Sequence, residues 1–202
     1  INGETTYALE GSIFMAGATI QWIRDGLQLI KDAKESQSLA EKTGYENPVY
    51  MVPAFAGLGA PYWDPDARGA IFGLTRATNK ADLVRATLES VCYQTHDLLS
   101  AMAEDGAKPQ SLRVDGGMVA NNWFVQTLSD IINLSTDRPK VMETTALGAA
   151  YLAGLQAGLY KNLEDISVNW QCAASFEPDM PAKDRAHQLK GWDASVRKVL
   201  TD

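Results

Sequence analysis

The stretch from Leu112 to Asn122 constrains the fold of this chain more than any other, and it reads Leu-Arg-Val-Asp-Gly-Gly-Met-Val-Ala-Asn-Asn. An alternating apolar run ends in Asp115-Gly116-Gly117, and residues with helical spacing follow at once. This pattern predicts a strand, a tight glycine turn and a helix from about Val119 to Ile132. Unpaired backbone N–H groups at such a turn, together with the positive end of the helix dipole, favour a phosphate or a nucleotide.

Strand and helix patterns alternate along the rest of the chain. Short β-branched or aromatic runs predict strands over residues 5–9, 49–55, 70–74 and 138–142. Apolar residues at helical spacing predict helices over residues 12–30, 79–104, 145–159 and 184–200. This order indicates an α/β domain with a mixed sheet that is at least partly parallel and is flanked by helices. Ligands of such sheets bind beyond the carboxyl ends of the strands, where Asp115-Gly116-Gly117 is expected.

The helix expected over residues 12–30, with Ser12 as its N-cap, carries a glycine that is unfavourable inside a helix. Gly17 costs about 1 kcal/mol relative to alanine at an interior position. Gln21 follows one turn later, so the two residues share a face of the helix. Two interpretations remain open: Gly17 permits tight packing beside a solvated Gln21, or a flat ligand lies on the glycine and is hydrogen-bonded by the amide.

Three other segments are expected to have structural roles. Residues 31–47 are polar and predict a solvated surface connection with a short helix near 36–42. The helix over residues 145–159 is rich in Ala and Gly, which indicates close packing against a neighbouring element. Arg85 and Glu89 are spaced for an i,i+4 ion pair, which contributes only a few tenths of a kcal/mol if it is exposed.

The composition of the 202 residues, 46% hydrophobic and 21% charged, is typical of a globular protein. A formal net charge of −7 and the lack of a basic run argue against a nucleic-acid surface. No run of about 18 apolar residues is present, so no membrane span is expected. Cys92 and Cys172 lie among apolar residues without C-x-x-C spacing, which predicts buried free thiols in the reducing cytoplasm. His96 has no partner at a metal-ligand spacing, so the residues predict no metal site.

Several short motifs occur together between residues 7 and 154. They are Tyr-Ala-Leu-Glu-Gly at 7–11 with Ala-Gly-Ala-Thr-Ile-Gln-Trp at 16–22, Pro-Ala-Phe-Ala-Gly-Leu-Gly-Ala-Pro-Tyr-Trp-Asp at 53–64, Gly-Ala-Ile-Phe-Gly-Leu-Thr-Arg at 69–76 with Arg-Ala-Thr-Leu-Glu at 85–89, Val-Asp-Gly-Gly at 114–117, and Thr-Ala-Leu-Gly-Ala-Ala-Tyr-Leu-Ala-Gly at 145–154. In combination they resemble the C-terminal domain of the carbohydrate and polyol kinases, most closely the members that phosphorylate glycerol. The resemblance implies an actin-like, ribonuclease-H-like ATPase fold with two lobes that close on a cleft. Residues 1–202 would supply most of the second, nucleotide-binding lobe.

Four residues match positions that contact the nucleotide in this family: Gly17, Gln21, Gly117 and Asn121. The resemblance therefore favours the ligand interpretation of Gly17 and Gln21. It also implies ATP with Mg²⁺ as the nucleotide and transfer of the γ-phosphate to a terminal hydroxyl of glycerol. A homo-oligomeric, cytoplasmic parent protein is implied as well.

The catalytic centre is expected to lie outside this chain. In the family, the general base, the side chains that hold glycerol and the phosphate-binding loop of the first lobe precede the matched segment. The chain begins without a Met and is expected to start within a longer protein, so no catalytic residue is assigned and the chain alone is expected to be inactive. Asp115 is expected to shape the turn or to help position a magnesium-bound phosphate.

Two alternatives to a glycerol-phosphorylating enzyme remain. The first is the same domain of a sister kinase that acts on xylulose, gluconate or another polyol. The second is a nucleotide-binding regulatory domain of the same fold that performs no chemistry.

Overall fold

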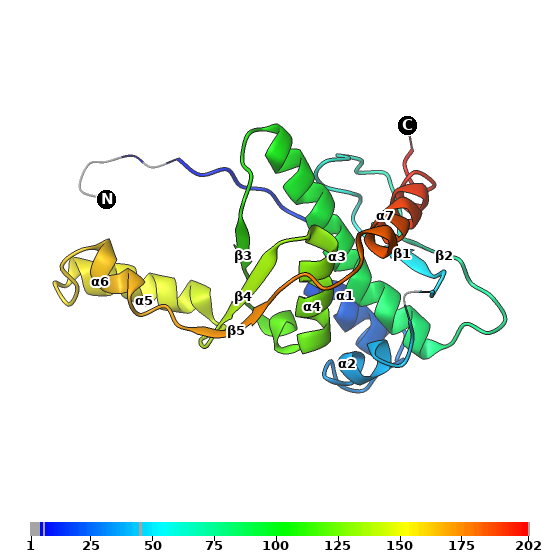
Figure 1. Ribbon diagram of the computed structural model, residues 1–202, viewed down its shortest axis with the longest axis horizontal. Coiled ribbons are helices and arrows are strands. Elements are labelled where there is room, and N and C mark those ends of the chain that lie inside the picture. The colour runs from blue at the N-terminus through cyan, green and yellow to red at the C-terminus, as the bar shows by residue number, and fades with distance from the viewer. Residues whose placement is uncertain (1–4, 6, 45, 202) are drawn as a thin grey trace.

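Two helices packed against each other, α3 and α4, form the centre of the molecule (Figure 1). The computed structural model describes residues 5, 7–44 and 46–201. α3 spans Lys80–Glu104 and begins at a capping box. The Asn79 side chain accepts a hydrogen bond from the Ala81 N–H at 2.8 Å, and the Asp82 carboxylate accepts one from the Asn79 N–H at 2.9 Å. The helix stops before Gly106, which has a φ of +94°, so the prediction for residues 79–104 is confirmed.

α4 spans Asn122–Ile132, and its apolar face packs on α3. Val84 and Leu88 of α3 are buried in this core together with Val125 of α4, and full burial of each such side chain stabilises the fold by about 1.5–3 kcal/mol. The helix begins three residues later than the sequence predicts. A tighter 3₁₀ helix, η2, occupies the residues before it, Gly117–Ala120.

Within the described residues, a mixed sheet of three strands lies against α4. Its strands are β3 (Ser111–Arg113), β4 (Ser135–Pro139) and β5 (Cys172–Phe176), in the order β3-β4-β5. β3 and β4 run parallel, with Ser111 opposite Ser135, whereas β4 and β5 run antiparallel. This arrangement confirms the predicted α/β class with a mixed sheet flanked by helices.

Prolines set the ends of two strands. The sequence predicts a strand over residues 138–142, whereas β4 covers Ser135–Pro139 and ends near the start of that range. The pairing of β4 with β5 becomes irregular between Arg138 and Pro139, because proline has no N–H to donate. A separate antiparallel pair, β1 (Tyr50–Val52) and β2 (Ala70–Phe72), confirms in shorter form the strands predicted over 49–55 and 70–74. Pro53 follows the last residue of β1.

The first helix is much shorter than the one predicted over residues 12–30. α1 covers Gly17–Gln21 and continues directly into a π-helical turn, η1, over Trp22–Gly26. The N-cap position is Ala16, so the expected cap at Ser12 is wrong. Residues 12–16 follow the helical spacing because Ile13 and Ala16 pack on the core from an irregular segment. Gly17 is the first helical residue and avoids the cost of an interior glycine.

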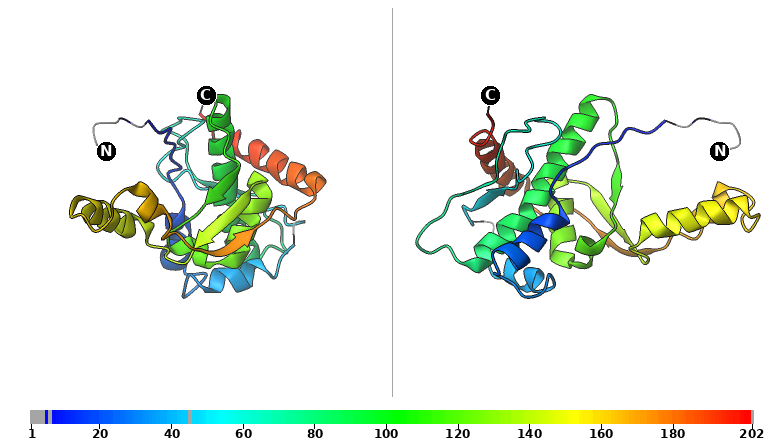
Figure 2. Two further views of the ribbon diagram at one scale, coloured as in Figure 1. Left: turned by 60° about the vertical axis from the view of Figure 1, so that its left-hand side comes forward. Right: turned by 180° about the vertical axis from the view of Figure 1, so that it is seen from behind.

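The segment between β4 and β5 projects from the body as an arm (Figure 1). It contains α5 (Thr144–Gln156) and α6 (Leu163–Ser167). Figure 2 shows the same arm from two further directions. The helix itself is confirmed, but its expected close packing is not found among the described residues, where Gly154 is the one buried position of α5.

The last helix, α7, spans Ala182–Val196 and packs on β1. Trp192 of α7 is fully buried and stacks on Tyr93 of α3, with ring centroids 5.3 Å apart. This confirms the helix predicted over residues 184–200, with an earlier end.

Other predictions concern the terminus and the thiols. The described residues 5 and 7–9 form no strand, and Thr6 lies outside the described part of the chain. Cys92 is buried as predicted, but Cys172 is exposed at the start of β5, so the second prediction of a buried thiol is wrong. Among the described helices, none is both long enough and apolar enough to cross a bilayer.

Candidate functional site

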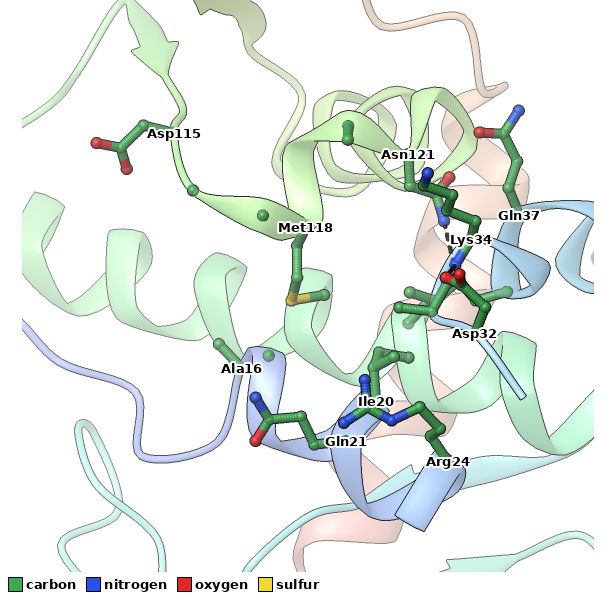
Figure 3. A pocket seen from close by; sticks show the side chains of 17 residues that line it. Ala16, Ile20, Gln21, Arg24, Asp32, Lys34, Gln37, Asp115, Met118 and Asn121 are labelled. Carbon is green, nitrogen blue, oxygen red and sulfur yellow. Dashed lines mark hydrogen bonds between the residues drawn. The ribbon is translucent and has the colours of Figure 1, made fainter. Parts of the chain in front are cut away.

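A pocket of about 650 Å³ lies between α1 with η1 on one side and the turn into η2 on the other (Figure 3). Its lining comes from residues within 16–24, 32–37 and 115–121 and from Leu88 of α3. It brings together Gly17, Gln21, Gly117 and Asn121, which the sequence predicts as nucleotide-binding residues. The volume is within the range of small-molecule sites.

Gly17 and Gln21 line the pocket from one face of α1, as their spacing predicts. The nearest described neighbours of a Cβ added at Gly17 are the Met118 Cγ and Sδ, both at the ordinary contact distance of 3.9 Å. Tight packing among the described residues therefore does not explain this glycine. The open space beside it supports the ligand interpretation of the pair, which stays a prediction.

The glycine turn after β3 forms the opposite wall. Gly116 has a φ of +84°, a conformation that favours glycine, and its N–H donates to the Met142 carbonyl at 3.0 Å. A Cβ added at Gly117 would meet no described atom within 4 Å, so there is room for a ligand at this residue. Gly117 opens η2 and not α4, which corrects its expected place at the start of the longer helix.

Asn121 joins two elements at the rim of the pocket. Its Oδ1 accepts a hydrogen bond from the Phe124 N–H at 3.0 Å and so caps α4. Its Nδ2 donates to the Ser36 Oγ at 3.3 Å. An amide offers two donor hydrogens and two lone pairs on its oxygen, so Asn121 retains capacity for a ligand.

α2 (Glu35–Ala40) confirms the short helix predicted near residues 36–42, but its place in the wall of the pocket was not predicted. Residues 31–47 were expected to be a solvated connection, yet Ser36, Leu39 and Ala40 are buried. The Gln37 Oε1 also accepts a hydrogen bond from the Asn122 N–H at 3.1 Å. The apolar pair Leu39-Ala40, three and four residues after Ser36, is the signal that could have identified this buried face.

The floor of the pocket is apolar and its rim is charged. Ile20, Leu88 and Met118 supply the apolar surface. At the rim, the Arg24 Nε and Nη2 donate to the two carboxylate oxygens of Asp25, each at 2.7 Å, and this hydrogen bonding lowers the pKa of Asp25. Arg24 and Ile20 both line the pocket (Figure 3). A flat ring with polar edges suits such a combination.

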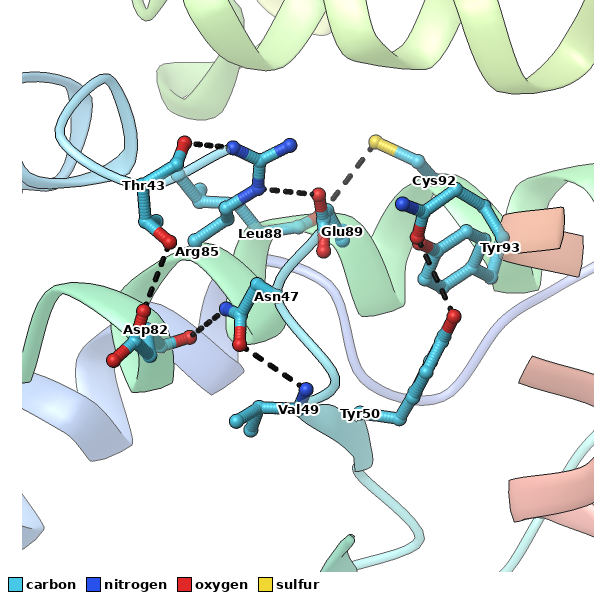
Figure 4. A network of polar contacts seen from close by, with 11 residues as sticks. Thr43, Asn47, Val49, Tyr50, Asp82, Arg85, Leu88, Glu89, Cys92 and Tyr93 are labelled. Atoms are coloured by element: carbon cyan, nitrogen blue, oxygen red, sulfur yellow. Dashed lines mark hydrogen bonds and ion pairs between the residues drawn. The ribbon is translucent and has the colours of Figure 1, made fainter. Parts of the chain in front are cut away.

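A buried ion pair lies on α3, on either side of the pocket residue Leu88 in the sequence (Figure 4). The Arg85 Nε lies 2.7 Å from the Glu89 Oε1, and both side chains are nearly inaccessible. The guanidinium also donates to the Thr43 carbonyl and lies over the Trp123 ring, 5.2 Å from its centroid. Burial raises the pKa of Glu89, and the adjacent guanidinium opposes this shift. The pair therefore ties α3 to α4 and to the segment after α2, and it is not the exposed pair considered from the sequence.

Acidic and histidine side chains form no metal centre within the part of the chain that the structure describes: no group of three or more His, Cys, Asp or Glu residues lies close enough to hold an ion. Asp115 is exposed at the edge of the pocket beyond β3 (Figure 3). His96 is half-buried on α3, with its Nδ1 3.3 Å from the Asp97 Oδ1.

Comparison with known sequences identifies a family and its members. Residues 1–157 match the C-terminal domain of the FGGY family of carbohydrate kinases. A glycerol kinase of Alcanivorax borkumensis is 60% identical over 200 residues, which are 98% of this chain and 40% of the relative. A glycerol kinase of Marinomonas sp. is 60% identical over 201 residues, with coverage of 100% and 41%. The chain thus spans about two fifths of the length of these curated relatives.

Solved structures agree with the sequence relatives. The glycerol kinase of Plasmodium falciparum, solved with ADP, superposes with a TM-score of 0.82 at 36% identity, covering 92% of this chain and 37% of that one. A ligand-bound xylulose kinase of Lactobacillus acidophilus gives a TM-score of 0.77 at 24% identity, covering 93% and 39%, and supports the fold alone. The chain therefore belongs to the FGGY family of carbohydrate kinases and carries the C-terminal domain of that family.

Proposed function

We propose that the pocket binds ATP or ADP, and that this chain is the nucleotide-binding half of a kinase that phosphorylates glycerol. The observation that carries the proposal is that one pocket brings together Gly17 and Gln21 with Gly117 and Asn121, although Gln21 and Gly117 lie 96 positions apart in the sequence. The ADP in the Plasmodium falciparum structure and the names of the 60% identical relatives support the nucleotide and the acceptor, respectively.

The pocket offers each part of the nucleotide a suitable environment. The base lies on the apolar floor of Ile20, Leu88 and Met118, while the amides of Gln21 and Asn121 hydrogen-bond its polar edges. Gly117 leaves the space in which the ligand approaches the backbone. The phosphates extend past Asp115 toward the other lobe.

Magnesium enters this proposal through the phosphates. Mg²⁺ is commonly held by one or two carboxylates together with substrate phosphates and water, which fits an exposed Asp115 at the edge of the pocket and the absence of a multi-carboxylate cluster from the described residues. When bound, the ion would neutralise charge on the transferred phosphoryl group. The residues of this chain bind and orient the nucleotide, whereas the general base and the glycerol contacts belong to the lobe outside it.

Calorimetric titration of the 202-residue chain with ADP tests the site. Gly117→Trp fills the space above the turn, and we expect it to weaken ADP binding at least 100-fold. Gly148→Trp is the matched control, since Gly148 also has no described atom near an added Cβ but lies on α5, outside the pocket. Equal affinity of wild type and Gly117→Trp for ADP would place the nucleotide elsewhere.

A further inference from the structure

The junction between η2 and α4 places one of the residues of the proposed nucleotide site. η2 ends at Ala120 and α4 begins at Asn122, so Asn121 lies between two helices. Its backbone is extended, with a φ of −82° and a ψ of 108°, and the chain changes direction there. Carbonyl groups at the end of a helix and N–H groups at the start of one have no partner within that helix. The position of Asn121 therefore depends on which groups bond to its neighbours.

Arg138 of β4 bonds to residues on both sides of Asn121. Its Nη1 donates to the Val119 carbonyl at 2.8 Å and to the Asn122 Oδ1 at 2.7 Å. Hydrogen bonds from a charged donor are about twice as strong as those between neutral groups. The Arg138 side chain is half-buried, and its Cζ lies 5.4 Å from the centroid of the Phe176 ring on β5. One cation, itself held against the sheet, thus spans the junction.

α2 holds the same junction from a second element. The Asn122 N–H donates to the Gln37 Oε1 at 3.1 Å, and the Asn121 Nδ2 donates to the Ser36 Oγ at 3.3 Å. Arg138 does not itself belong to the described residues that line the pocket, whereas Ser36, Gln37 and Asn121 do. Any effect of Arg138 on a ligand must therefore pass through the junction.

We propose that Arg138 is a positioning residue for nucleotide binding: it holds the junction between η2 and α4 so that the Asn121 amide keeps its place in the pocket. The inference rests on the proposed function, in which Asn121 contacts the nucleotide. Without the guanidinium, the Val119 carbonyl and the Asn122 side chain bond to water, and the junction gains freedom. Nucleotide binding must then order it again, which lowers the affinity.

Arg138→Met tests the proposal by calorimetric titration with ADP. Methionine keeps an apolar contact with Phe176 but donates no hydrogen bond to the junction. We expect ADP to bind about 10-fold more weakly to this variant. Arg138→Lys should recover most of the lost affinity, because both bonds come from a single nitrogen and an ammonium group has three donor hydrogens.

Arg185→Met is the matched control. The Arg185 Nη1 on α7 donates to the Asn133 Oδ1 at 2.6 Å, at the other end of α4 and outside the pocket. This substitution removes the same charge and another bond between arginine and asparagine, and it should leave the ADP affinity unchanged. An equal loss of affinity in both variants would make the lost charge the cause and overturn the proposal.

A double-mutant cycle separates positioning from a general structural effect. If Arg138 acts through Asn121, its loss has little left to change once the Asn121 amide is gone. In the Asn121→Ala background we therefore expect Arg138→Met to change the ADP affinity by about 2-fold or less. Independent effects that simply multiply would contradict the proposal.

Hydrogen exchange without ADP gives a second measurement. The Phe124 N–H donates to the Asn121 Oδ1, and we expect its exchange to be about 10-fold faster in Arg138→Met than in the wild type. Unchanged exchange would overturn the proposal. A wild type that does not bind ADP overturns the proposed function and this inference together, whereas ADP binding that Arg138→Met leaves intact overturns the inference alone.

Discussion

Asn121 shows how one side chain links a helix end to the pocket. It caps α4 through the Phe124 N–H and reaches α2 through Ser36. The sequence match proposes Asn121 as a nucleotide contact, and the structure gives it a second role in holding the pocket walls together.

Asn121→Ala should therefore affect both stability and binding. Loss of the cap lowers the free energy of unfolding by about 1 kcal/mol, and loss of the tie to α2 weakens ADP binding about 10-fold or more. The measurements are chemical denaturation and ADP titration.

Asn162→Ala is the control for this variant. Asn162 caps α6 in the same manner, with its Oδ1 2.9 Å from the Asp165 N–H, but lies outside the pocket. It should leave ADP affinity unchanged. If Asn121→Ala also binds ADP normally, Asn121 is a cap and nothing more.

At the scale of the elements, α7 is anchored to the core by one aromatic residue. Trp192 is 1% exposed, stacks on Tyr93, and donates from its Nε1 to the Asp97 Oδ2 at 2.6 Å. Tyr62 donates to the same oxygen at 2.7 Å, and burial raises the pKa of this tyrosine. The loop after β1, helix α3 and helix α7 thus meet at Asp97.

We expect Trp192→Ala to lower the free energy of unfolding by about 3–5 kcal/mol, because it leaves a large cavity and an unpaired Asp97 contact. Denaturant titration followed by circular dichroism measures this loss. Trp63→Ala is the comparison, since Trp63 is 70% exposed, and it should change stability by about 0.5 kcal/mol or less. Similar losses in both variants would mean that α7 is not anchored through Trp192.

At the scale of the whole molecule, the proposed function makes this chain one side of a reaction site. Phosphoryl transfer requires the nucleotide, the acceptor and the general base to be held in one geometry. The chain spans 40% of its Alcanivorax borkumensis relative, and the resemblance assigns the acceptor side to the remainder.

The isolated chain should therefore show no kinase activity. In a coupled assay, its ADP release should not depend on glycerol. Co-expression of the chain with the part of the Alcanivorax borkumensis relative that lies outside the match should restore glycerol-dependent release. Glycerol-dependent release by the isolated chain would show that it contains a complete active site.

The sequence by itself determined the features that depend on neighbouring residues. Asn79 and Asp82 cap α3 through bonds to residues two and three positions away, so the start of that helix could be predicted closely. Gly17 and Gln21 share a face because one helical turn separates them. The two glycines after β3, Gly116 and Gly117, indicate a turn whatever the surrounding structure is. The motif combination also indicated the family without any tertiary contact.

The tertiary structure decided what depends on which distant segments meet. Residues 12–16 have helical spacing but pack in an irregular segment, the polar residues 31–47 contain a buried wall of the pocket, and the pair Arg85 and Glu89 is buried because Thr43 and Trp123 lie over it. The exposure of α5 is of the same kind, since its uncharged sequence predicts burial but cannot supply the partner. Burial is a property of the assembled chain, and local spacing specifies only which face is available for it.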